Sequence, residues 1–318
     1  MKVAQSKKTI AIFGASGFLG SSIVLGLNQS NYCLKLFSRN KEKIKFWTVN
    51  PNIQIFDFNL DNLEQVKKDL KNTDVVINLL GILHQSKKDS FDKIHHIWPS
   101  HLAKTMKELG IKRLLHVSAL GASSNAPSLY LKSKILGEAA LHKQKDLHLT
   151  ILRPSIIFGA KDNFINMFKL LVKWLPMIAL LSPQSKFQPI YIEDVSKIIT
   201  KSLWDKKTYG KVYELGGPDV YSLKEIIKLI IKSEKLKRLI IPLNKPLSYI
   251  LAFSMEMLPV KILTRDNWRS MQVNNVVDPQ YAMHYRHSFE RLEHYLNNKK
   301  NRSPMRVKYN FYRSKSGR

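Results

Sequence analysis

The sequence predicts an α/β fold in which a doubly wound parallel sheet carries helices on both faces. Three observations lead to this prediction. An apolar run rich in β-branched residues, Thr9–Phe13, is followed at once by spaced glycines and then by a helical apolar pattern. Short apolar runs go on alternating with helical patterns for more than half of the chain, which is typical of parallel sheets with crossover helices. The 318 residues, 44% of them hydrophobic, suffice for a full core.

The elements are expected in regular alternation along the chain. Further strands are predicted at Leu34–Phe37, Ile53–Phe56, Val75–Leu80, Arg113–Val117 and Leu149–Leu152, and helices near Leu63–Leu70, Ile94–Leu109 and Leu129–Leu141. After Arg153 the pattern loosens. It still predicts a strand at Pro189–Ile192, a helix from Val195, a strand at Val212–Leu215 and a helix over Leu223–Ile231. We therefore expect a smaller mixed C-terminal part beside the main sheet.

The turn after the first strand has the spacing G-x-x-G-x-x-G. Gly14 permits a tight turn, Gly17 lets the backbone approach a pyrophosphate, and Gly20 lets the new helix pack against the strand. The helix N-terminus also offers unpaired N–H groups to phosphates. A structural turn is the alternative, but the flanking strand and helix favour dinucleotide binding on a Rossmann-type sheet. Further contacts are expected from neighbours in the loop and first helical turn: Ser16, Phe18 and Leu19.

The ends of the second, third and fourth strands indicate which dinucleotide binds. Ser38 and Arg39 stand where an acidic residue would bind the ribose 2′-hydroxyl of NAD. A guanidinium there pairs naturally with a 2′-phosphate. NADP(H) is therefore favoured over NAD(H), and a solvated basic loop is the alternative. The remaining expected contacts are Asn59 and Leu60 near the adenine, and Asn78, Leu79 and Gly81 where the backbone approaches the cofactor.

Ser118 follows the fifth predicted strand, and Tyr130 and Lys134 lie on the helix after it. At i and i+4 the two helical side chains share one face. A phenol beside an ammonium ionises more easily, because the positive charge stabilises the phenolate. Such a tyrosine can transfer a proton to or from a carbonyl oxygen that Ser118 orients, while Lys134 holds ribose hydroxyls. We therefore predict these three as catalytic residues, the alternative being an exposed lysine beside a half-buried tyrosine.

The chain is strongly basic, with 52 Lys and Arg against 24 Asp and Glu and a net charge of +28. This charge suits an anionic membrane, an acidic protein partner or nucleic acid, or it reflects a proteome rich in lysine and asparagine. Nucleic acid is disfavoured because the residue pattern of a nucleic-acid-binding module is missing. His95, His96 and His101 have no Cys or carboxylate at ligand spacing, so no metal site is expected.

Compartment signals point to a bacterial cytoplasmic protein, or to one encoded in the compartment where it works. The single cysteine, Cys33, excludes a disulfide framework. The first strand begins so near Met1 that we expect no signal peptide. No apolar run has the length of a transmembrane helix, since the nearest candidate, Phe164–Leu181, is interrupted by Pro176 and by lysines.

The C-terminal region changes character beyond the last predicted helix. Pro246–Pro259 is an apolar helical stretch, either a core helix or a helix that docks at a surface. From His294 onward basic residues accumulate beside aromatic ones without any acid. This tail is either a flexible terminus or a contact with anionic lipid or a partner. The expected division is residues 1–160 as an NADP(H)-binding domain, 161–295 as a smaller part, interleaved with the sheet, that forms a substrate cleft or docks partners, and 296–318 as a flexible basic tail.

Several motifs together resemble the extended and atypical short-chain dehydrogenase/reductase superfamily. They are the glycine motif, Asn78, Ser118 with Tyr130 and Lys134, Leu152–Gly159 and Gln188–Val195. A finer resemblance is to the family of respiratory complex I alpha-subcomplex subunit 9 and its bacterial relatives. It is carried by His116–Ala122, Tyr130–Lys134, Gly137–Glu138, the same Leu152–Gly159 block and Tyr213–Pro218.

The resemblance implies an NADPH-binding fold at the side of the complex I peripheral arm, with a structural nucleotide and a C-terminal region near the membrane and the quinone site. The implied partners are peripheral-arm subunits, and the implied location is the cytoplasmic face of the inner membrane. An anionic membrane surface is a further expected partner of the C-terminal region. Because Tyr130 and Lys134 are retained, an NADP-dependent oxidoreductase, epimerase or dehydratase of the extended family is the alternative.

The resemblance also assigns roles by position. It implies that Arg39 holds the 2′-phosphate and Lys134 the nicotinamide ribose, and that the three glycines hold the pyrophosphate. One departure is Asn59, where relatives often carry Asp. Two residues of the Leu152–Gly159 block complete the expected cofactor contacts: Pro154 and Ile157.

Overall fold

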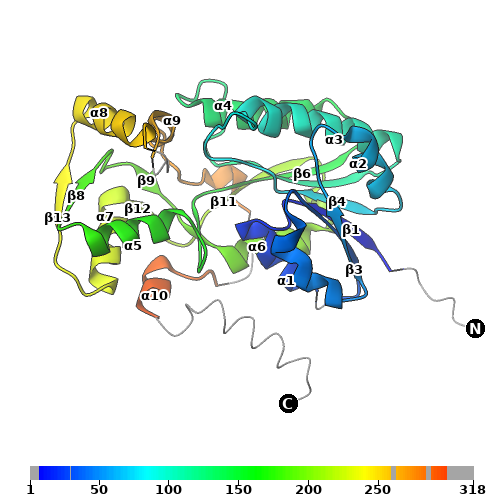
Figure 1. Ribbon diagram of the computed structural model, residues 1–318, viewed down its shortest axis with the longest axis horizontal. Helices are drawn as coiled ribbons and strands as arrows, with labels where there is room; N and C mark the ends of the chain where they lie inside the picture. The colour runs from blue at the N-terminus through cyan, green and yellow to red at the C-terminus, as the bar shows by residue number, and fades with distance from the viewer. Residues whose placement is uncertain (1–6, 29, 259–262, 284–287, 299–318) are drawn as a thin grey trace, which may run out of the picture.

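The computed structural model describes residues 7–28, 30–258, 263–283 and 288–298 (Figure 1). Its main sheet has seven strands in the order β11-β6-β5-β4-β1-β2-β3, and all of its strand pairs are parallel. This is the strand order of a doubly wound dinucleotide-binding sheet, extended at one edge by β11, so the predicted fold class is confirmed. The strands are β1 Thr9–Phe13, β2 Cys33–Ser38, β3 Ile53–Asp57, β4 Val75–Asn78, β5 Arg113–Val117, β6 His148–Pro154 and β11 Lys211–Leu215.

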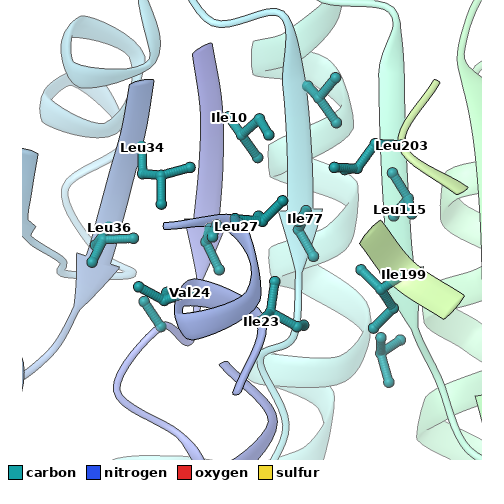
Figure 2. Packing of buried hydrophobic residues seen from close by; sticks show 14 of the residues in the cluster. Ile10, Ile23, Val24, Leu27, Leu34, Leu36, Ile77, Leu115, Ile199 and Leu203 are labelled. Carbon is teal, nitrogen blue, oxygen red and sulfur yellow. The ribbon is translucent and has the colours of Figure 1, made fainter. Parts of the chain in front are cut away.

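Helices cover both faces of this sheet (Figure 1). On one face, α1 (Phe18–Leu27), α6 (Ile192–Ser202) and the 3₁₀-helix η1 (Lys41–Val49) bury an aliphatic core against the strands. Figure 2 shows the apolar side chains of α1 facing the strands, with Ile199 and Leu203 beside them. The other face is covered by α2 (Leu63–Leu70), α3 (Trp98–Glu108) and α4 (Leu129–His142).

A smaller C-terminal part has a core of its own around Phe158, Ile226 and Leu292. Its helices are α5 Phe164–Trp174, α7 Leu223–Ser233, α8 Lys245–Glu256, α9 Arg265–Ser270 and α10 Leu292–Asn297, with the short 3₁₀ turn η4 Pro279–Tyr281. Its strands form three two-stranded sheets: β7 Ile157–Phe158 with β10 Ile190–Tyr191, β9 Lys186–Phe187 with β12 Tyr221–Ser222, and β8 Met177–Leu180 with β13 Leu239–Pro242. A second 3₁₀ turn, η3 Lys206–Thr208, belongs to the main sheet, where Thr208 is hydrogen-bonded to Thr150 of β6.

Several predicted boundaries need correction. The fourth strand ends at Asn78 rather than Leu80, and the helix expected from Val195 begins at Ile192, because α6 follows β10 directly. The helix expected over Ile94–Leu109 opens with a π-helical turn, η2 Lys93–Ile97, and continues as α3.

The apolar C-terminal stretch is a helix, α8, that packs one side only. Ala252 is fully buried, whereas Ile250 is 61% and Met257 74% exposed. The basic tail expected at 296–318 begins within α10, where Leu296 is buried, and its residues 299–318 lie outside the described residues. None of the helices in the described ranges combines the length and the apolarity that crossing a bilayer requires.

Candidate nucleotide-binding site

The glycine loop joins β1 to α1 with the geometry that its spacing predicts. Gly14 has a φ of +83°, a conformation that side chains other than glycine rarely tolerate, and its carbonyl accepts the Gly17 N–H at 2.9 Å. A Cβ on Gly20 would lie only 2.2 Å from that same carbonyl oxygen. The helix therefore starts directly against the loop. No side chain in the described part of the chain caps the N-terminus of α1, which leaves its N–H groups to a phosphate.

The ends of β1 and β2 are tied together beside this loop. The buried Ser38 hydroxyl lies 2.9 Å from the Ser16 hydroxyl. Arg39, the next residue, forms an ion pair with Asp89, a residue of the long segment after β4. The Arg39 side chain is 48% exposed. Arg39 thus follows a residue that contacts the glycine loop, and its guanidinium pairs with the Asp89 carboxylate. Contact of Arg39 with a 2′-phosphate stays a prediction.

Two further residues beside the glycine loop point into the protein as much as toward a ligand. Leu19 packs against the aliphatic core of the α1 face. The ring of Phe18 would lie 3.1 Å from a Cβ on Gly159, so Phe18 contacts the loop after β7. Both therefore help to hold the glycine loop in place.

The residues after β3 lie at the rim. Asn59 is exposed, and its side-chain oxygen accepts the Asp61 N–H at 3.0 Å. Leu60 is half-buried against the core of the α2 face. An asparagine closing its own turn has one carbonyl lone pair in use. Adenine contact by these two residues stays a prediction.

Asn78 has a different role from the one its position suggested. Its amide donates to His116 Nδ1 at 3.1 Å, and its side-chain oxygen accepts from Trp98 Nε1 and the Leu80 N–H at 3.3 Å each. The side chain is fully buried. The Asn78 side chain therefore links β4, β5 and α3. Since its amide is used inside the protein, only the backbone after Asn78 is left to approach the cofactor.

The backbone after β4 does approach the glycine loop. The Leu79 carbonyl carbon would lie 3.3 Å from a Cβ on Gly14. A Cβ on Gly81 would lie 3.1 Å from Lys134 Nζ. The missing side chain at Gly81 therefore makes room for the lysine ammonium.

The N-terminus of α4 is fixed in place by two side chains. The Ser128 hydroxyl accepts the Leu131 N–H, and the Asp266 carboxylate accepts the N–H groups of Leu129 and Tyr130 at 2.7 and 3.0 Å. An acid at a helix N-terminus is favourable. α9 of the C-terminal part thus positions the helix that carries Tyr130 and Lys134.

Burial controls the ionisation of this pair. Burial lowers the pKa of Lys134 to about 8, against the opposing charge of Glu138, and its Nζ donates to the Val117 carbonyl at 3.4 Å. Burial also raises the pKa of Tyr130 to about 12. Burial therefore acts against the easier ionisation that the sequence suggests for Tyr130, because loss of hydration disfavours the phenolate.

Ser118 completes the predicted set. It is 4% exposed, and its hydroxyl has no hydrogen-bond partner among the described residues. A buried hydroxyl without a partner is costly, so a ligand that offers this hydroxyl an acceptor or donor would stabilise the site. Ser118 follows β5 directly and therefore lies at the same sheet edge as Lys134's partner, the Val117 carbonyl.

Two histidines at this site were missed as site residues. His95, on η2, contacts the Ile82 N–H through Nε2 at 3.0 Å and the Ser133 hydroxyl through Nδ1 at 2.8 Å. Since Ser133 donates its own proton to the Tyr130 carbonyl at 2.7 Å, Nδ1 of His95 carries the hydrogen and Nε2 accepts. Burial, with the charges of Lys134 and His116, lowers the pKa of His95 to about 2. The ring thus clamps the segment after β4 to α4 as a neutral imidazole.

His116 lies in β5, two residues before Ser118, which directly follows the strand, so period-two alternation points both side chains to one face. Burial, with the charge of Lys134, lowers the pKa of His116 to about 3. Its Nε2 has no hydrogen-bond partner in the described residues. The alternation of side chains along the strand is the sequence signal that could have identified His116 as a site residue. No sequence signal could have identified His95, because a π-helical turn places its ring.

Pro154 is the last residue of β6, and Ile157 begins β7. The Pro154 carbonyl accepts the Leu120 N–H at 3.0 Å, and Ile157, in β7, packs against the aliphatic core. Nearby, Arg153 Nη2 donates to the buried Glu138 at 2.6 Å. No group of three metal-ligating side chains occurs in the described ranges.

These positions fit a dinucleotide. The glycine cradle excludes any Cβ, the N-terminus of α1 faces the loop, and a buried ammonium lies at the ends of β4 and β5. A cradle for a pyrophosphate and a donor for ribose hydroxyls therefore share one edge of the sheet.

Known proteins of related sequence point the same way. Residues 14–164 match a family described as NAD(P)H-binding. The chain is 33% identical over 228 residues to the mitochondrial NADH dehydrogenase [ubiquinone] 1 alpha subcomplex subunit 9 of Arabidopsis thaliana, covering 69% of this chain and 56% of that protein. It is 30% identical over 224 residues to the subunit of the same name in Dictyostelium discoideum, covering 69% and 62%. The chain thus spans less than two thirds of the length of these relatives.

Among solved structures, a nucleoside-diphosphate-sugar epimerase from Staphylococcus aureus superposes with a TM-score of 0.70 at 15% identity, over 91% of this chain and all of that one. At such low identity this likeness concerns the fold. Together with the glycine cradle and the sequence relatives, it identifies the chain as an extended short-chain dehydrogenase/reductase-like protein with an NAD(P)H-binding domain, distantly related to the alpha subcomplex subunit 9 family of complex I.

Proposed function

We propose that the protein is an NADP(H)-binding accessory subunit or assembly partner of respiratory complex I, in which the nucleotide is structural. The observation that carries this proposal is the exposed apolar face of α8. Leu247, Ile250 and Phe253 of α8, and Met257 directly after it, are between 45% and 74% exposed, and their spacing places them along one side of the helix. Exposed apolar side chains gathered on one side of a helix favour an interaction site.

Burial raises the pKa of Tyr130 to about 12, which disfavours this phenol as a general base that would take a proton from an alcohol. The relatives near 30% identity are named as complex I subunits, which supports peripheral-arm subunits as the partners. Arg39 beside the glycine loop supports NADP(H) over NAD(H).

On this proposal the protein works at the cytoplasmic face of a bacterial inner membrane. We expect the C-terminal part to contact the anionic surface of that membrane, to which the net charge of +28 adds electrostatic attraction. The division into a nucleotide-binding domain, an interleaved smaller part and a basic tail belongs to the same proposal.

The test is purification of the tagged protein from native membranes, with identification of the proteins and nucleotides that accompany it. We expect complex I subunits and stoichiometric NADPH. Ile250→Glu should lose the subunits, because it charges the apolar face. Leu136→Glu is the matched control, since Leu136 is 48% exposed on α4, and it should retain them. Recovery of no complex I subunit with the unaltered protein would overturn the proposal.

A second candidate is an NADP-dependent oxidoreductase or epimerase that uses Ser118, Tyr130 and Lys134. The unpartnered Ser118 hydroxyl favours it, because a substrate carbonyl would satisfy that group. On this alternative, Tyr130→Phe should lower turnover in a screen of carbonyl compounds and nucleotide sugars by about a hundredfold or more. Bound nucleotide that keeps its redox state throughout the screen argues against this candidate.

A further inference from the structure

We propose that Asp89 governs the nucleotide preference of the site by competing with a 2′-phosphate for Arg39. This inference rests on the proposed function, since it concerns the same nucleotide site, and it adds a specificity-determining residue from a distant segment. Asp89 lies 50 residues beyond Arg39 in the sequence, so no local motif would associate the two.

The backbone places Arg39 next to the region where an adenosine ribose binds. In doubly wound sheets the ribose lies between the ends of β1 and β2. The Ser38 hydroxyl is hydrogen-bonded to the Ser16 hydroxyl of the glycine loop at 2.9 Å, which fixes the end of β2 against that loop. Arg39 follows immediately, so its guanidinium starts from a fixed point beside the glycine cradle.

A short turn holds Asp89 in place over this arginine. The Ser86 N–H donates to the Asp89 carbonyl at 2.9 Å, and the Ser86 hydroxyl accepts the Asp89 N–H at 3.1 Å. The Asp89 side chain is 22% exposed, less than half the exposure of Arg39. The carboxylate is therefore presented to Arg39 by the fold of the segment after β4, the same segment whose first residue packs on Gly14.

The ion pair between Arg39 and Asp89 is compatible with bound NADH but has to break when NADPH binds. The ribose 2′-hydroxyl of NADH can donate to a carboxylate while the pair with Arg39 stays intact. The 2′-phosphate of NADPH needs Arg39 for itself and carries the same sign of charge as Asp89, so it must displace the carboxylate. Arg39 favours NADP(H), Asp89 opposes it, and the balance between them sets the preference.

The experiment measures the dissociation constants of NADPH and NADH by calorimetry for the full chain and three variants. Asp89→Asn should raise the preference for NADPH over NADH by about three- to tenfold, mainly through tighter NADPH binding. Arg39→Gln should shift the preference toward NADH. Asp92→Asn is the matched control: it removes one charge from the neighbouring sequence, but its carboxylate contacts His96, at 2.8 Å, and the preference should not change.

The outcomes separate the two proposals. If Asp89→Asn and Asp92→Asn shift the preference equally, the effect is one of bulk charge and this inference is overturned. An unchanged preference in Asp89→Asn also overturns it, while tight binding of NADPH by the unaltered protein leaves the proposed function standing. Failure of the unaltered protein to bind either nucleotide removes the proposed nucleotide site itself. The Asp89→Asn effect should shrink at high ionic strength, because the pair is partly exposed.

Discussion

Lys134 has two properties that oppose each other: its role as a ribose donor favours a charged ammonium, and its burial disfavours that charge. Its ammonium lies at the ends of β4 and β5, where a ribose would be held, yet it is only 5% exposed. Burial lowers its pKa to about 8 from 10.5. Up to pH 8 both the folded and the unfolded protein carry the charge, and the folded protein bears the full penalty of burying it. Between pH 8 and 10.5 only the unfolded protein stays protonated, so stability rises with pH across that window.

Lys134→Met should therefore stabilise the protein while weakening nucleotide binding. At pH 7 we expect the free energy of unfolding to rise by about 1–3 kcal/mol, because Glu138 keeps its partner Arg153 and no buried charge is left alone. NADPH affinity should fall about tenfold with the loss of a charged donor. Urea unfolding from pH 7 to 10.5 checks this: the gain should shrink as pH rises, and a constant gain would contradict the burial argument.

At the scale of a helix, the two glycines of α1 occupy opposite situations. A Cβ on Gly20 would lie 2.2 Å from the Gly14 carbonyl oxygen and 2.8 Å from the Ala15 Cα. A Cβ on Gly26 would find its nearest neighbour, Ser196 Oγ, at 3.6 Å, which is an ordinary contact. The first glycine sets the distance between the helix and its strand, whereas the second only weakens the helix.

Gly20→Ala should destabilise the protein by about 3 kcal/mol or more, since the clash is with backbone that cannot rotate away. Gly26→Ala should be neutral or stabilise it by up to about 1 kcal/mol, the difference in helix propensity. Chemical denaturation of the two variants measures both values. Similar stabilities for the pair would mean that α1 does not pack as closely as described.

Over the whole molecule, the nucleotide-binding sheet depends on residues from far along the chain. α6 contributes Val195, Ile198 and Ile199 to the core of the α1 face, and all three are almost completely buried. β11 pairs with β6 at the sheet edge, and Asp266 fixes the start of α4. The nucleotide-binding part and the C-terminal part therefore share core and sheet contacts and are not two independent domains in series.

A fragment of residues 1–160 should consequently fail to fold cooperatively. Loss of these three side chains alone removes about 5–9 kcal/mol of burial, comparable with the whole stability of a typical domain. Circular dichroism and thermal melting of the fragment check this, with the full chain as the reference. A sharp melting transition in the fragment would show that the first domain stands alone.

The sequence by itself determined the sheet, the glycine cradle and the face of α4, because each depends on local periodicity. Arg113–Val117 and Leu63–Leu70 were predicted with the bounds that the structure gives. Only the tertiary structure decided which partners the side chains of the site contact and how far they are buried. It turned Asn78 inward to His116, raised the pKa of Tyr130 by burial, brought Asp89 to Arg39 and left one face of α8 exposed. Hydration and long-range contacts are set by the packing of segments distant in sequence, and no local pattern encodes them.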